Sequence, residues 1–199
     1  MISRIWITRW RWALCVALFM LSIIIVDQNV PFAGEKILTY TFEKPHNVIG
    51  RFRPWIRYRE LNSSDGTKIV KIVEDPVYFD IWTPVRYQRA RIEFTYQNRS
   101  QAVLSVGLRR SASQWDIQLQ EVQSMRKEGE WTVGYAEFDL SSVELQYQKY
   151  TFLISAPGLV VEKPERGDIL LKKQEVLLKR DPLVTSLWKR INKQRYQKS

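Results

Sequence analysis

Two aromatic side chains flank a carboxylate at alternate positions of one short segment, as Tyr78, Asp80 and Trp82. Alternation with period two places the three side chains on the same face of a β-strand. An aromatic ring can stack on the C–H groups of a sugar, and a neighbouring carboxylate can accept directional hydrogen bonds. This combination is suited to holding a small polyhydroxylated ligand.

Further polar and aromatic partners come from two other segments. A strand expected at 89–97 carries Arg and Glu on its polar face, and a long irregular segment at 44–68 carries Trp and Tyr. Long loops in compact domains are often functional. The alternative is that Tyr78 and Trp82 cover the second side of the sheet or pack beneath the 44–68 segment. The full set of candidate ligand-binding residues is Tyr78, Asp80, Trp82, Arg91, Glu93, Trp55 and Tyr58.

The sequence offers few residues for catalysis or metal binding. Hydrolysis of a glycosidic bond needs two carboxylates about 5–9.5 Å apart, which Asp80 with Glu93 or Asp116 would meet only under favourable strand pairing. The chain has one His and one Cys, and His46 stands in a loop sequence without a second His or Cys to complete a metal site. We therefore expect no enzymatic activity, no cofactor and no metal.

An apolar segment near the N-terminus is typical of a membrane-directed helix. Residues 12–26 carry no charge and follow three arginines within residues 1–11. A membrane core about 30 Å thick needs about 20 residues, so we place the span at 12–30. Because Lys and Arg stay on the cytoplasmic side, residues 1–11 are predicted inside and everything after the span outside the cytoplasm. An uncleaved anchor is favoured over a signal peptide because residues 31–34 form a poor cleavage site.

Nearly every periodic segment after the span alternates with period two, the pattern of strands with one buried face. In the strand at 89–97, Ala90, Ile92, Phe94 and Tyr96 share the predicted core face. The same reasoning assigns Trp115, Ile117, Leu119 and Trp131 to the core. We predict an all-β, antiparallel jelly-roll or β-sandwich over residues 31–180, with about nine strands at 36–43, 69–73, 77–82, 89–97, 102–109, 114–120, 131–140, 150–155 and 168–178.

The net charge of +10 is concentrated at the two ends of the chain, with +3 in residues 1–26 and +7 in residues 172–199. The neutral body between them does not resemble a duplex-binding domain, so no specific nucleic-acid partner is expected. Asp181-Pro182 is a helix-start signal, and residues 181–199 read as a short basic amphipathic helix that contacts the membrane surface or packs on the domain. The candidate membrane-surface residues are Trp188, Lys189, Arg190, Lys193 and Arg195.

Four sequence segments together resemble single-span bacterial envelope proteins of uncharacterised activity with a galactose-binding-like jelly roll of the carbohydrate-binding-module type. The resemblance covers residues 36–180, and its most specific part is Asp75-Pro76-Val77-Tyr78-Phe79-Asp80. It implies a glycan-binding or envelope-structural role and no activity. The segments are EDPVYFDIWTP (74–84), RARIEFTYQN (89–98), VLSVGLRRSASQWDIQLQ (103–120) and YTFLISAPGL (150–159).

The residues and the resemblance together favour a membrane-anchored, extracytoplasmic β-sandwich that binds an envelope glycan without enzymatic activity. The alternative is a structural subunit that uses its sheet edges and the 44–68 segment to assemble with envelope proteins. In both hypotheses the protein has a single membrane span and lies in the cell membrane with its N-terminus in the cytoplasm.

Overall fold

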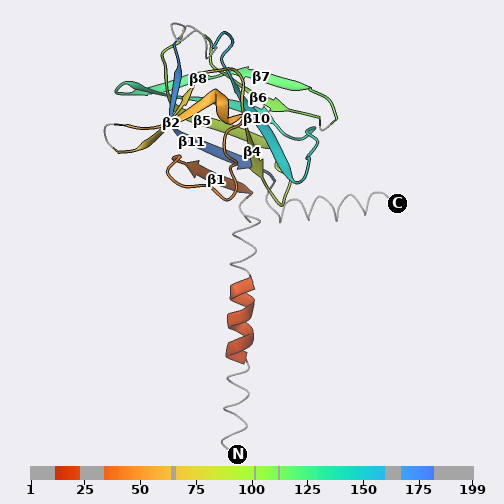
Figure 1. Cartoon of the computed structure of the whole chain (residues 1–199). Helices are drawn as coiled ribbons and strands as arrows, with labels where there is room; N and C mark the ends of the chain where they lie inside the picture. The colour runs from red at the N-terminus through yellow and green to blue at the C-terminus, as the bar shows by residue number, and fades with distance from the viewer. Residues whose placement is uncertain are drawn as a thin grey trace, which may run out of the picture. The chain divides into compact units, whose positions relative to one another are not determined.

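The computed structural model describes residues 12–22, 34–63, 66–100, 102–111, 113–159 and 167–181 (Figure 1). Residues 12–22 form a helix whose side chains are all exposed. Within the described residues, no helix is both long enough and apolar enough to cross a membrane. The predicted span at 12–30 continues beyond this helix into residues that are not described, so the anchor stays a prediction.

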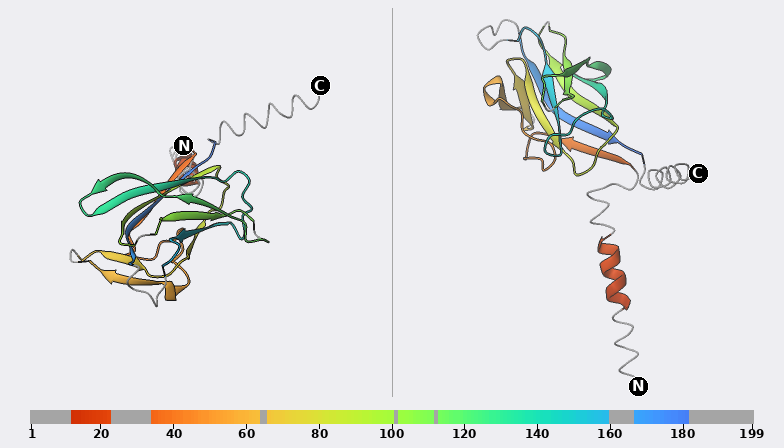
Figure 2. Two further views of the ribbon diagram at one scale, coloured as in Figure 1. Left: turned by 90° about the horizontal axis from the view of Figure 1, so that it is seen from above. Right: turned by 90° about the vertical axis from the view of Figure 1, so that its right-hand side faces the viewer.

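Lys36–Arg180 form a compact unit built from two antiparallel sheets packed against each other (Figure 2). The predicted β-sandwich is therefore confirmed. The four-stranded sheet consists, in spatial order, of β4 (Val77–Trp82), β10 (Lys149–Ser155), β6 (Ser105–Arg109) and β7 (Ile117–Glu121). The seven-stranded sheet consists, in spatial order, of β2 (Tyr58–Asn62), β3 (Lys68–Ile72), β11 (Ile169–Lys179), β5 (Arg89–Asn98), β9 (Trp131–Asp139) and β8 (Gln123–Glu128), with β1 (Glu35–Tyr40) also paired to β11.

The core between the sheets is filled by the apolar side of each alternating strand. In β5, Ala90, Ile92, Phe94 and Tyr96 are buried as predicted. Phe79 of the four-stranded sheet is fully buried, with its ring centroid 6.4 Å from that of Phe94 in the other sheet. Each such buried side chain contributes about 1.5–3 kcal/mol to folding, so contacts across this layer hold the two sheets together.

Most consecutive strands cross from one sheet to the other, and β2–β3, β6–β7 and β8–β9 pair as antiparallel neighbours within a sheet. This connectivity is of the jelly-roll kind. Two strands were not predicted: β2, which lies inside the segment expected to be a loop, and β8. Neither has a buried residue, so neither carries the apolar alternation from which strands were predicted.

The segment before β2 is also partly extended. Ile49 pairs with Ile81 and Arg53 pairs with Tyr78, which places residues 48–53 beside β4. A short 3-10 helix, η1 (Trp55–Arg57), then leads into β2. The predicted long loop therefore covers the free edge of β4, and this position brings Arg53 to the surface formed by Tyr78 and its neighbours.

Candidate functional site

The outer face of the four-stranded sheet carries the three residues that the alternation of β4 predicted to lie together. Val77, Phe79 and Ile81 are fully buried in the core, so Tyr78, Asp80 and Trp82 project from the opposite face. In the neighbouring strand β10, Thr151 lies opposite Asp80 and Leu153 lies opposite Tyr78. The same outer face therefore continues across β10.

Strand β7 presents its apolar side to this outer face, contrary to prediction. Leu108 of β6 is buried in the core and pairs with Gln118, so Gln118 faces inward. Ile117 and Leu119 consequently face outward, and Leu119 is 57% exposed. The prediction that Trp115, Ile117 and Leu119 form a core face was wrong. Strand pairing, which the alternation itself does not contain, sets which side is buried.

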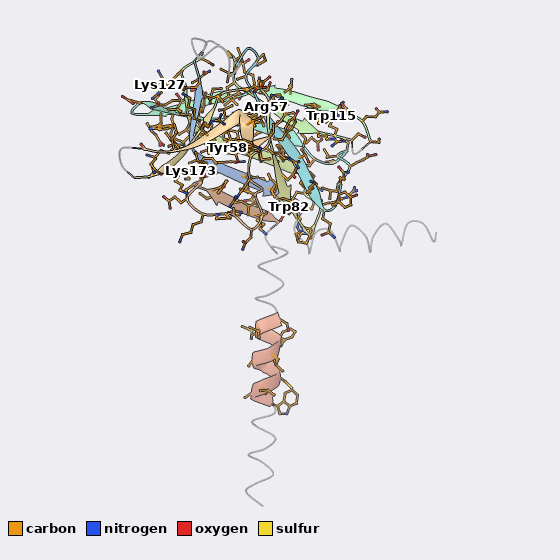
Figure 3. All side chains as sticks on the ribbon, in the orientation of Figure 1. Arg57, Tyr58, Trp82, Trp115, Lys127 and Lys173 are labelled. Atoms are coloured by element: carbon orange, nitrogen blue, oxygen red, sulfur yellow. The ribbon has the colours of Figure 1, made fainter. Side chains whose placement is uncertain are left out.

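Trp115 lies in the turn between β6 and β7 and is 70% exposed. Its ring centroid is 6.0 Å from that of Tyr78, although β7 and β4 are the two outermost strands of the sheet. The guanidinium carbon of Arg109 is 4.9 Å from the same indole. We call Tyr78, Trp82 and Trp115 the aromatic face, and Figure 3 shows Trp82 and Trp115 on the side of the molecule that carries β4 and β7.

Trp82 is held in place by backbone beside it and remains 42% exposed. A Cβ atom at Gly50 would lie 2.8 Å from the indole Cζ3, so a residue without a side chain is needed where the ring crosses the 48–53 segment. The backbone N–H of Trp82 donates to the carbonyl of Val48, 2.8 Å away. On the strand next to it, the ammonium of Lys149 lies 5.8 Å from the Trp82 ring centroid.

Asp80 is buried beneath this surface, with 5% of its side chain exposed. One of its oxygens, Oδ1, accepts from Arg53 Nη2 at 2.8 Å and from the Thr151 hydroxyl at 2.7 Å. The other, Oδ2, accepts from Lys149 Nζ at 2.9 Å. The sequence predicted that Asp80 would accept hydrogen bonds from a ligand. In the structure both of its oxygens accept hydrogen bonds from protein donors, so Asp80 holds the head groups of Arg53 and Lys149 in place.

Arg91 and Glu93 do not belong to this surface. They lie on β5 of the seven-stranded sheet and face away from the core, because Ala90, Ile92 and Phe94 between and beside them are buried. Arg91 lies 3.5 Å from Glu93 and stacks on Tyr135 at 3.9 Å. The predicted site is therefore divided between the outer faces of two sheets, and the hydrolytic pair of Asp80 and Glu93 is separated by the core.

The two residues from the 44–68 segment also have different positions. Trp55 lies in η1 and is 72% exposed, with no ring contact among the described residues. Tyr58 packs against the core, with its ring 6.0 Å from that of Phe52. Burial, and then repulsion from Glu60, raise the pKa of Tyr58. Trp55 is therefore exposed to solvent, as a ligand-binding residue would be, whereas Tyr58 is packed against the core.

Two clefts lie on the seven-stranded sheet, away from the aromatic face. One has a volume of about 410 Å³ and is lined by charged residues, among them Arg89, Arg91 and Glu137. The other has a volume of about 250 Å³ and contains Trp131, which is half-buried beside Lys172. Trp131 was predicted to be in the core, but its position on β9 places it on the outer face. In the part of the chain that the structure describes, no three His, Cys, Asp or Glu side chains form a group able to hold a metal ion.

Sequence reasoning did not predict that Arg53, Lys149 and Thr151 lie beside Asp80, and it assigned Trp115 to the core. Arg53 and Lys149 are separated from Asp80 by 27 and 69 positions, so no local pattern connects them. No local signal identified the outward position of Trp115, because pairing with β6 decides which side of 117–121 faces inward. The candidate tail residues Trp188, Lys189, Arg190, Lys193 and Arg195 lie outside the described residues.

No protein-family model and no curated protein matches this sequence. Among solved structures, the chain is similar to the CBM22-1 xylan-binding domain of Paenibacillus barcinonensis, with a TM-score of 0.47 and 11% identity over 74% of this chain and 97% of that chain. It is also similar to the xylan-binding module CBM15, with a TM-score of 0.44 and 17% identity over 73% and 97% of the two chains. A third is the C-terminal CBM6 of LamC from Zobellia galactanivorans, with a TM-score of 0.42 and 12% identity over 71% and 98%.

Proposed function

We propose that the aromatic face binds a glycan of the cell envelope and that the protein has no enzymatic activity. The observation that carries this proposal is the exposure of Trp115 and Trp82 on one continuous sheet face that also holds the bonded trio of Arg53, Asp80 and Lys149. Exposed tryptophan rings offer flat surfaces for the C–H groups of sugars, and the ordered polar groups give direction. Exposed apolar area gathered on one face of a folded protein supports a binding role for that face.

The non-enzymatic part of the proposal is supported by the arrangement of the carboxylates. Asp80 has both oxygens bonded to protein donors, and Asp116 pairs with Arg110 at 2.8 Å. Both carboxylates are therefore paired with cationic side chains of the protein itself. The aromatic face thus has the groups for binding a sugar, and the two carboxylates considered for hydrolysis on this side, Asp80 and Asp116, are held by cationic side chains.

The membrane part of the proposal has its support in the sequence. An uncharged segment at 12–26 follows three arginines, which favours a span at 12–30 with the sandwich outside the cytoplasm. Alkaline extraction of membranes and protease treatment of intact cells test this part separately from ligand binding. Release of the protein by alkali, or protection of the sandwich from external protease, would contradict it.

Binding is tested with the full-length protein on immobilised polysaccharides, including those isolated from the envelope of the source cells. We expect saturable binding to at least one polysaccharide and its loss in Trp82→Ala. The matched control is Trp131→Ala on the opposite sheet, which should bind as the wild type does. Absence of binding to every polysaccharide, or equal loss in both variants, would contradict glycan binding by the aromatic face.

A second candidate function is assembly with envelope proteins, which the edge strand β7 favours. It is the last strand of its sheet, and Leu119 on it is 57% exposed. An exposed strand edge with apolar side chains can pair with a strand of another chain. Cross-linking in membranes distinguishes the two functions, because discrete protein partners without sugar affinity would support assembly.

A further inference from the structure

The aromatic face has an excess of cationic hydrogen-bond donors over acceptors. Arg53 donates to Asp80 from Nη2, while 51% of its side chain stays exposed. A guanidinium has five N–H donors and an ammonium has three, so one contact to Asp80 leaves Arg53 and Lys149 with further donors. Asp80, in contrast, already accepts three hydrogen bonds. A ligand at this position would therefore meet donors more often than acceptors.

The charges around the aromatic rings also favour an anionic ligand. Arg53 and Lys149 lie beside Asp80, and Arg109 lies over Trp115. Asp80 carries one negative charge against the two positive charges of Arg53 and Lys149, and its burial keeps it from repelling an anion at the surface. A second carboxylate on this face, Glu121, lies at the far end of β7. Cations held in a fixed arrangement next to an aromatic surface that is partly shielded from water attract anionic groups.

We propose, on the basis of the glycan-binding function above, that the ligand is an acidic polysaccharide. Its sugar rings stack on Trp115 and Trp82, and its anionic groups are bound by Arg53 and Lys149. Asp80 acts through these two residues, because the hydrogen bonds that it accepts from Arg53 and Lys149 hold their head groups at the surface. The recognised chemistry is an anion repeated along a glycan chain, and uronate carboxylates and phosphodiesters both present it.

A matched pair of polymers tests this proposal without any variant. Polygalacturonate and its fully methyl-esterified form have the same backbone and differ in carboxylate charge. We expect the full-length protein to bind polygalacturonate, or a polysaccharide of phosphodiester-linked sugars, about tenfold or more tightly than the esterified polymer, as the loss of charge-assisted hydrogen bonds requires. The uronate and phosphate arms distinguish the two sources of the anion.

Three single-charge variants separate specific contacts from general attraction to a basic protein. Arg53→Gln and Lys149→Gln should each weaken binding to the preferred acidic polymer about fivefold to tenfold. Lys127→Gln removes the same charge from β8, where Lys127 is exposed on the other sheet (Figure 3), and should leave the affinity unchanged. Circular dichroism and thermal unfolding establish that each variant is folded. If Lys149→Gln fails to fold, the affinity of Arg53→Gln tests the proposal, because the half-exposed Arg53 side chain can be replaced without disturbing the core.

The possible outcomes separate this proposal from the proposed function. Equal binding to charged and esterified polymers overturns the acidic ligand and leaves glycan binding intact. If Lys127→Gln weakens binding to acidic polymers as much as Arg53→Gln does, the binding is general attraction to a basic protein. This result also overturns the acidic ligand. Binding to neutral polysaccharides alone overturns the acidic ligand, and binding to none overturns the proposed function itself.

Discussion

The rings of Tyr78 and Trp115 lie 6.0 Å apart although they come from opposite edges of the four-stranded sheet. Trp115 reaches toward Tyr78 from the turn before β7, and the surface between them includes Leu153, which is 4% exposed, and Gly107. A Cβ at Gly107 would lie 2.7 Å from the Leu153 side chain. Because Gly107 has no side chain, the side chains of Leu153 on β10 and Ile117 on β7 can approach each other above it.

Replacing Trp115 with alanine is expected to reduce ligand affinity while leaving the fold intact. The ring is 70% exposed, so its loss should lower the free energy of unfolding by less than about 1 kcal/mol. Loss of a stacking platform should weaken glycan binding about tenfold or more. Titration calorimetry and denaturant unfolding measure the two effects, and a large loss of stability with unchanged affinity would show a structural role instead.

Asp80→Asn is expected to destabilise the sandwich and to weaken binding together. The substitution removes a buried carboxylate from Arg53, Lys149 and Thr151 and leaves two cations without their counter-charge. Because the Arg53 side chain is half-exposed, water screens part of the effect, and we expect a loss of about 1–3 kcal/mol in the free energy of unfolding. Chemical denaturation checks this value. Asp116→Asn, at an exposed ion pair, is the control and should change stability little.

Gln174→Met is expected to stabilise the protein. Gln174 is fully buried and pairs in register with Phe94, so it faces the core. Its amide oxygen and nitrogen have no hydrogen-bond partner among the residues that the structure describes. Replacing an unsatisfied buried amide by an apolar chain of similar length should raise the free energy of unfolding by about 1–2 kcal/mol.

The control for this substitution is Gln97→Met in the neighbouring strand. The Gln97 amide bonds to Glu130 at 3.3 Å and to Arg99 at 2.8 Å, so its removal should be destabilising. Thermal and denaturant unfolding of both variants compare the two amides directly. A decrease in the stability of Gln174→Met would show that its amide contributes a favourable interaction.

Stability should fall as the pH is lowered from 7.5 to 5.5, because of the only histidine in the chain. The Nδ1 atom of His46 accepts the backbone N–H groups of Val48 and Ile49 at 3.1 and 3.0 Å. Burial, and then repulsion from Lys36, lower its pKa from the ordinary value of 6.5. The contribution of neutral His46 is therefore complete above that value and is lost as the pH falls toward the folded-state pKa.

The variant His46→Asn keeps a neutral acceptor at this position and cannot titrate. Its unfolding free energy should be independent of pH between 7.5 and 5.5, where carboxylates remain ionised. Urea unfolding at several pH values compares it with the wild type. A slope that persists in His46→Asn would assign the pH dependence to other groups.

The strands could be predicted from the sequence wherever apolar and polar residues alternate along several positions. Strand β5 matched its expected core face because its two sides differ strongly, with Ile92 and Phe94 on one side and the charged Arg91 and Glu93 on the other. Strands β2 and β8 did not follow, because edge strands form through backbone hydrogen bonds and need no buried side chain. Strand β7, whose apolar side faces outward, also shows what the sequence pattern alone does not predict. Its alternation was correct, but the choice of the buried side depended on pairing with β6.

The sequence by itself determined the β-sandwich, the basic ends of the chain and the common face of Tyr78, Asp80 and Trp82, because composition and period two are properties of the local chain. Only the tertiary structure placed Arg53, Lys149 and Trp115 at that face and moved Arg91 and Glu93 to the other sheet. Contacts between residues far apart in the chain depend on strand order and register. These are set by the packing of the whole core, and no short segment of sequence contains them.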